Sequence, residues 1–143
     1  MVGQAFTGGM LHDIGKLLLA ANLPDGFKEA LARAREQQIH LWDAETSVFG
    51  ATHGELGACL LGIWGLPMPI VEAVALHHYP IRFLSKKFCP LTAVHAANAI
   101  EHETPGDNKQ GIMCATVDAN YLTELGLGER LDAWRDRCQE KLL

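Results

Sequence analysis

The sequence predicts an all-α fold, a compact bundle of about six to seven helices. Apolar residues recur at helical spacing along nearly the whole chain, and no segment shows the sustained apolar–polar alternation that marks half-buried strands. The chain of 143 residues also holds no internal repeat, low-complexity tract or linker long enough to divide it. We therefore expect residues 1–143 to form a single helical domain.

Proline and apolar spacing define the first segments. A first helix is expected over 5–21, because Pro24 cannot continue a helix and disfavours helical backbone in the residue before it. A second helix is expected from near Asp25 to just before Leu41. Residues 41–50 are expected to form either a connection or a short helix.

Start and stop signals define the middle of the chain. Thr52 is expected to be an N-cap, because Glu55 stands three residues further on and completes the capping-box pattern. A third helix is therefore predicted over 52–65. A fourth follows over about 67–78, since proline is favoured in the first turn of a helix.

The last third of the chain is expected to hold three further helices. The fifth covers roughly 90–102 and ends before a turn-rich stretch at 104–108. Asp118 is expected to cap the sixth and Gly128 to precede the seventh. The segment 118–143 should therefore form a terminal helical pair.

Composition excludes several classes of protein. No apolar run reaches the roughly 18 to 20 residues that span a bilayer, and the first residues lack the features of a secretory signal. The four cysteines are widely separated, which predicts reduced thiols. The net charge is −5, which argues against a nucleic-acid polymer as a partner. We expect a cytoplasmic protein that makes no membrane contact.

Histidines are the residues that point to chemistry. The chain holds seven, and most of them lie on the predicted apolar helices. A divalent transition metal such as Zn, Mn or Fe requires nitrogen and carboxylate donors that converge from several buried helices. His95 and His102 are interpreted as structural residues and His40 as a surface residue. The candidate metal ligands are His12, Asp13, His53, His77 and His78.

Each candidate has an ordinary alternative when it is taken alone. Neighbours on a helix point about 100° apart, so the pair at 12–13 could be one buried and one exposed group. His53 could be a simple helix-start residue, and the pair at 77–78 could be a polar helix terminus. Lys16 would usually be solvated, although one turn beyond a metal it could meet a phosphate oxygen.

The combination is more specific than its parts. Four segments occur in order, and their sequences are GMLHDIGK at 9–16, HGELGA at 53–58, WGLP at 64–67 and HHYP at 77–80. This ordered set closely resembles the HDOD domain, a branch of the HD superfamily, over about 6–102. The resemblance implies a bundle of the HD type and a relation to metal-dependent HD phosphohydrolases and to HD-GYP cyclic-dinucleotide phosphodiesterases.

The resemblance also implies roles for single residues. The five candidate ligands fall where such enzymes bind metal, with Asp13 as the bridging carboxylate. Lys16 matches the lysine that assists phosphate binding. If the chain is active, Asp13 and Lys16 are the expected catalytic residues, and metal-activated water would attack a phosphodiester.

Three departures from the enzymes weaken the catalytic interpretation. The enzymes have a further histidine upstream of the His-Asp pair, and none of the eleven residues before His12 is a histidine. Asn98 stands where those enzymes carry a metal-binding aspartate, and a neutral amide is a poorer ligand. The Gly-Tyr-Pro signature is missing after the histidine pair at 77–78.

These features favour a regulatory output module of the HDOD type with a degenerate metal pocket that holds a divalent metal or none. It would act through contacts with signalling proteins or receiver domains. The alternative is a metal-dependent phosphohydrolase for a nucleotide or cyclic dinucleotide, and a purely structural helical fragment is a third interpretation. The short segment before His12 predicts the C-terminal part of such a domain, without its N-terminal helices. Its first helix would then expose apolar surface, so we expect a homo-oligomer.

Overall fold

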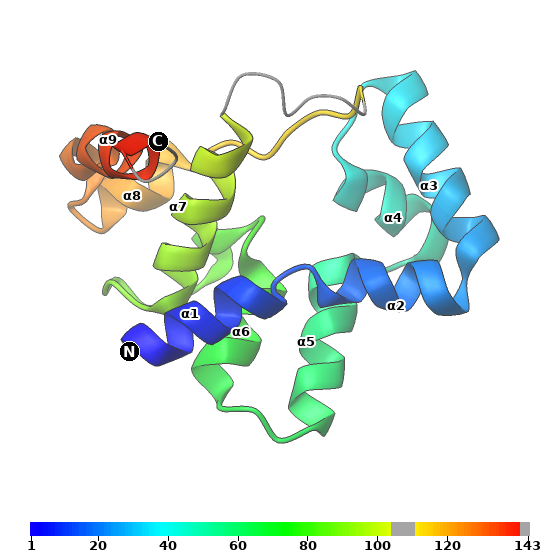
Figure 1. Cartoon of the computed structure of the whole chain (residues 1–143), viewed down its shortest axis with the longest axis horizontal. Coiled ribbons are helices and arrows are strands. Elements are labelled where there is room, and N and C mark those ends of the chain that lie inside the picture. The colour runs from blue at the N-terminus through cyan, green and yellow to red at the C-terminus, as the bar shows by residue number, and fades with distance from the viewer. Residues whose placement is uncertain (104–110, 141–143) are drawn as a thin grey trace.

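The computed structural model describes residues 1–103 and 111–140. Apart from one isolated bridge between His40 and Met113, all regular elements in these residues are helical, which confirms the all-α prediction (Figure 1). The turn-rich stretch at 104–108 and the last residues of the terminal pair lie outside the described residues. The elements are α1 (Val2–Leu11), α2 (Ile14–Asn22), α3 (Pro24–Gln37), α4 (Leu41–Phe49), α5 (His53–Ile63), α6 (Met68–Leu76), η1 (Pro80–Arg82), α7 (Pro90–His102), α8 (Ala119–Glu124), η2 (Gly128–Arg130) and α9 (Leu131–Glu140).

The first predicted helix, over 5–21, is wrong as a single element, because it is divided into α1 and α2. Asp13 leaves the helical region of backbone space, with φ −100° and ψ 8°, and is the N-cap of α2. The two halves pack against different neighbours. α1 lies against α6 and α7, whereas α2 lies against α5 and α3. A single straight helix could not pack against both sets of neighbouring helices. Apolar spacing alone does not reveal the break.

The segment 41–50 is the short helix α4, one of the two possibilities left open by the sequence. Gly50 ends it in the left-handed region, with φ 75°, a conformation that glycine adopts without steric cost. The described residues therefore hold more helices than the expected six to seven. The first predicted helix consists of two separate helices, and the segment 41–50 adds a further one. The second predicted helix is confirmed as α3.

The capping predictions in the middle and end of the chain are confirmed. The Thr52 hydroxyl accepts a bond from the Glu55 backbone N–H, and the Glu55 carboxylate accepts one from the Thr52 N–H. α7 has the predicted bounds of 90–102. Asp118 caps α8 by accepting the N–H of Tyr121. Gly128 opens the short η2, which continues into α9.

Small residues allow α2, α5 and α6 to pack closely. A Cβ atom built on Gly15 would lie 1.9 Å from the backbone oxygen of His53, and one on Gly57 would lie 3.0 Å from the Ile14 side chain. A buried apolar cluster joins α5 and α6, with Leu61 and Val74 fully buried. The close contact of Gly15 with His53 places the turn between α1 and α2 directly over the start of α5 (Figure 1).

The outer face of α1 is apolar and exposed, as the sequence predicts. Val2, Phe6 and Met10 recur at four-residue spacing and are 80%, 70% and 71% exposed. Among the residues that the structure describes, no helix has both the length and the apolar character needed to cross a membrane.

Candidate metal centre

Three helix junctions bring four donor side chains together. Asp13 lies in the turn between α1 and α2, His53 is the first residue of α5, and His77 and His78 directly follow α6. One carboxylate oxygen of Asp13 and one ring nitrogen of each histidine all lie within 4.8 Å of one another. We call these residues the four-donor cluster, and it contains four of the five ligands expected from the sequence.

The distances in the four-donor cluster suit one small metal ion. Nε2 of His53 lies 3.3 Å from Oδ1 of Asp13 and 3.1 Å from Nε2 of His78. Nε2 of His77 lies 3.9 Å from the same Asp13 oxygen. Ligand atoms around a tetrahedral zinc ion, with bonds of about 2.0 Å, are roughly 3.3 Å apart. The donor set therefore fits Zn or a similar ion.

Two atoms of the cluster lack the hydrogen bonds that buried polar atoms normally make. Oδ1 of Asp13 and Nε2 of His77 are buried and have no partner among the described residues. An unsatisfied buried polar atom is costly and calls for an explanation. A cation shared between these two atoms would satisfy both of them.

Hydrogen bonds behind the cluster fix which ring nitrogen faces it. Nδ1 of His53 donates to the Glu45 carboxylate at 2.7 Å, and Nδ1 of His77 donates to the Val74 carbonyl at 2.7 Å. A carbonyl oxygen and a carboxylate oxygen both accept, so each ring holds its proton on Nδ1 when it is neutral. The lone pair on each Nε2 is then directed toward Asp13, which is the arrangement that metal-binding histidines usually have.

Helix α4 supplies supporting residues that sequence reasoning missed. Glu45 is fully buried, and Trp42 stacks on the His78 ring with centroids 3.7 Å apart. The segment was predicted as a connection or a short helix, so no buried face was assigned to it. The one signal in the sequence is a glutamate within a short, largely apolar segment before His53.

Charge in the cluster is concentrated on Asp13 and His53. Burial would raise the pKa of Asp13, but the close approach of the His53 ring, the hydrogen bond from Lys16 and the nearby positive charge hold it well below its usual range. Burial would lower the pKa of His53, but the nearby carboxylates of Asp13 and Glu45 outweigh burial and raise it. The two carboxylates thus both favour positive charge on the His53 ring.

Acid should destabilise the metal-free chain through the other two histidines. Burial lowers the pKa of His77 to about 3 and also lowers that of His78. A histidine whose pKa is lowered by folding contributes its full stability at pH values above its unfolded pKa of about 6.5. This contribution is lost as the pH falls toward the pKa of the folded state. The raised pKa of His53 acts in the opposite sense, whereas the pKa of His95 is also lowered and adds to the effect of the pair. Urea unfolding at several pH values should show a falling unfolding free energy between about pH 6.5 and about pH 3. A rise over this range would contradict the expectation.

Lys16 and His12 flank the open side of the cluster. Nζ of Lys16 donates to Oδ2 of Asp13 at 2.7 Å, and Nε2 of His12 lies 3.6 Å from the same oxygen. Nδ1 of His12 donates to the Gly9 carbonyl. His12, expected as a ligand, therefore lies beside the second carboxylate oxygen and outside the four-donor cluster.

Asn98 stands where the resemblance implies a metal-binding aspartate. It is buried on α7 and, together with His12 and Glu101, lines a cavity of about 340 Å³ between α1 and α7. The cluster therefore has Asp13 as its one carboxylate among the described residues.

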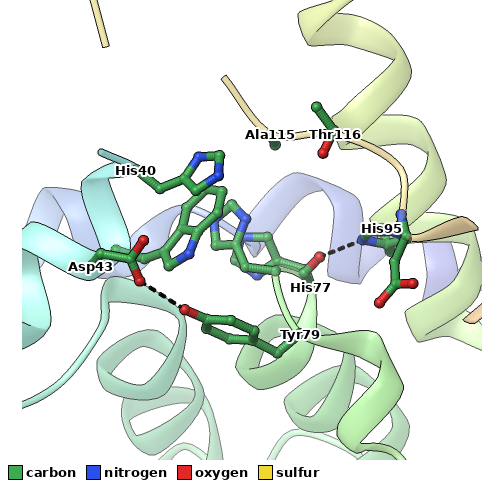
Figure 2. Close-up of a pocket in the computed structure, with 10 residues that line it drawn as sticks. His40, Asp43, His77, Tyr79, His95, Ala115 and Thr116 are labelled. Atoms are coloured by element: carbon green, nitrogen blue, oxygen red, sulfur yellow. Dashed lines mark hydrogen bonds between the residues drawn. The ribbon is translucent and has the colours of Figure 1, made fainter. Parts of the chain in front are cut away.

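A second cavity, of about 290 Å³, adjoins the histidine pair (Figure 2). His40 and Tyr79 lie on one side of it and His95 on the other. Nδ1 of His95 donates to the His77 carbonyl at 2.7 Å, and Nε2 of His95 accepts the Asp118 N–H at 2.9 Å. Burial lowers the pKa of His95. The ring is thus a neutral link between the end of α6 and the start of α8, in agreement with its interpretation as structural.

The helical bundle and its cluster of histidines and one aspartate are those of an HD-superfamily-related domain. The sequence model of the HDOD domain matches residues 1–80, which is more than half of the chain. The chain therefore belongs to the HDOD domain family, as its motifs predicted. The whole four-donor cluster lies within the matched residues, whereas Asn98 lies beyond them.

One relative has been described only as an uncharacterized protein, from Treponema pallidum (strain Nichols). It is 24% identical to this chain over 78 residues, which are 54% of the chain and 15% of that protein. The chain thus spans only a small part of this relative's length. No solved structure matches the chain.

Proposed function

We propose that the chain is a regulatory module that holds one divalent transition-metal ion in the four-donor cluster and acts through contacts with other proteins. The number of donors carries this proposal. Four protein ligands complete a tetrahedral shell, as in structural sites, whereas catalytic zinc sites usually have three protein ligands and one open position. A two-metal phosphodiesterase needs more ligands than this cluster supplies.

The bound ion would join elements that are distant in sequence. Asp13 would hold it from the turn between α1 and α2, His53 from the start of α5, and the pair at 77–78 from the end of α6. The ion would supply positive charge that offsets the carboxylates of Asp13 and Glu45. If the ion were lost, the three helix junctions could move apart. Metal occupancy would therefore affect the shape of the bundle directly.

The exposed face of α1 is the proposed contact surface, and a second copy of the chain or a signalling protein is the proposed partner. Contiguous exposed apolar residues are typical of protein interfaces. The four free cysteines agree with a cytoplasmic setting, which we include in the proposal.

A charge on this face should abolish self-association. We expect the chain to sediment as a dimer and the Phe6→Asp variant to sediment as a monomer, because a buried unpaired carboxylate is costly in an interface. The matched control is Leu84→Asp, because Leu84 is 93% exposed and is not part of α1. A wild-type chain that remains monomeric at high concentration would refute self-association.

A metal-dependent phosphohydrolase is the second candidate, and the position of Lys16 favours it. Its ammonium group borders the partly exposed Asp13 carboxylate, where it could bind a phosphate oxygen of a nucleotide or cyclic dinucleotide. Hydrolysis of bis-nitrophenyl phosphate in added Mn²⁺ separates the two candidates. The regulatory module predicts no turnover, whereas turnover that disappears in Lys16→Ala would replace it with the enzyme.

A further inference from the structure

We propose that Glu45 is a positioning residue for the metal centre, holding the His53 ring in place and strengthening it as a ligand. The inference rests on the proposed function, because it assumes that the four-donor cluster binds metal. Glu45 does not reach the cluster itself. It acts through the far side of the His53 ring.

A single carboxylate oxygen of Glu45 accepts two hydrogen bonds from His53. It accepts the backbone N–H of His53 at 2.8 Å and the ring Nδ1–H at 2.7 Å. The first bond fixes the start of α5, and the second fixes the rotation of the ring. Both side chains are 0% exposed, so no water competes for either bond.

The charge of Glu45 is the second part of the argument. A buried carboxylate is costly unless positive charge lies close to it. Among the residues that the structure describes, its ion-pair partner is His53, and its other oxygen is buried without a hydrogen-bond partner. A metal ion on Nε2 of His53 would place positive charge on the opposite side of the ring.

Glu45 therefore makes His53 different from the other histidines. The His77 ring is oriented by a neutral carbonyl, whereas the His53 ring is oriented by a full negative charge. A carboxylate behind a metal-binding histidine raises the basicity of the ligand, and loss of such partners typically weakens metal affinity about 10- to 100-fold.

The Glu45→Gln variant tests this role, because it preserves shape and removes the charge. Zn²⁺ affinity, measured by competition with a chromophoric chelator, should fall about 10- to 100-fold. The matched control is Glu36→Gln, an exposed position on α3, which should leave the affinity unchanged. Zn²⁺ binding by Glu45→Gln as tight as that of the wild type would overturn the proposal.

A measurement on the metal-free wild type needs no variant. Long-range ¹H–¹⁵N spectra report which nitrogens of a histidine carry protons, and we expect Nδ1 of His53 to carry one, because it donates to Glu45. An Nδ1 of His53 without its proton would overturn the proposed pairing. If the pairing is intact but the wild type binds no Zn²⁺, the proposed function fails. If Zn²⁺ binds equally to wild type and Glu45→Gln, only the positioning role fails.

Discussion

Replacing Gly15 with alanine should destabilise the fold by about 3 kcal/mol or more, the upper end of the usual cost of overpacking. The added Cβ atom would lie 1.9 Å from the oxygen of His53, and this oxygen belongs to the backbone and cannot rotate away. α2 must therefore move away from α5. Because this contact places the Asp13 turn over His53, the variant should also bind Zn²⁺ more weakly.

The prediction can be checked by urea unfolding of metal-free protein. The control is Gly62→Ala, because nothing lies within 4 Å of a Cβ atom built at that exposed position on α5. Alanine there should be neutral or stabilising, since it is the better helix former. An equal unfolding free energy for Gly15→Ala and wild type would show that α2 and α5 are less closely packed than the structure indicates.

The second large effect is expected for His53→Ala, which should cost about 3–5 kcal/mol in the metal-free chain. The variant removes both a proposed ligand and the ring that pairs with Glu45. A carboxylate that is fully buried then keeps only the backbone N–H of residue 53. Zn²⁺ binding should be lost as well.

A double variant separates the buried charge from the lost packing. Replacing both His53 and Glu45 with leucine removes the pair and retains apolar volume, so it should recover much of the stability that His53→Ala loses. The measurement is again the free energy of unfolding in urea. Losses that simply add in the double variant would contradict a coupled pair.

Local signals in the sequence predicted those elements that local chemistry determines. The capping box at Thr52, the cap at Asp118 and the bounds of α7 depend on residues a few positions apart, and the structure confirms them. The division of the first helix at Asp13 could not be predicted in this way. It arises because α1 and α2 follow different partner helices, and such contacts leave no local signal.

The candidate site was predictable to a similar extent. An ordered set of motifs identified Asp13 and the histidines of the four-donor cluster before their geometry was known. No motif contains Glu45, and its importance depends on a contact with His53 across a helix boundary. The resemblance also placed Asn98 where the enzymes carry a metal-binding aspartate, and in the structure Asn98 and His12 line the same cavity.

The most direct test of the proposed metal centre is the stoichiometry of metal binding. An untagged chain, purified without added metal, should be analysed for metal content and then titrated with Zn²⁺ by calorimetry after chelation. We expect about one ion per chain, and a His77→Ala variant that binds far less. A wild-type chain that is isolated free of metal and takes up no Zn²⁺ would contradict the proposal.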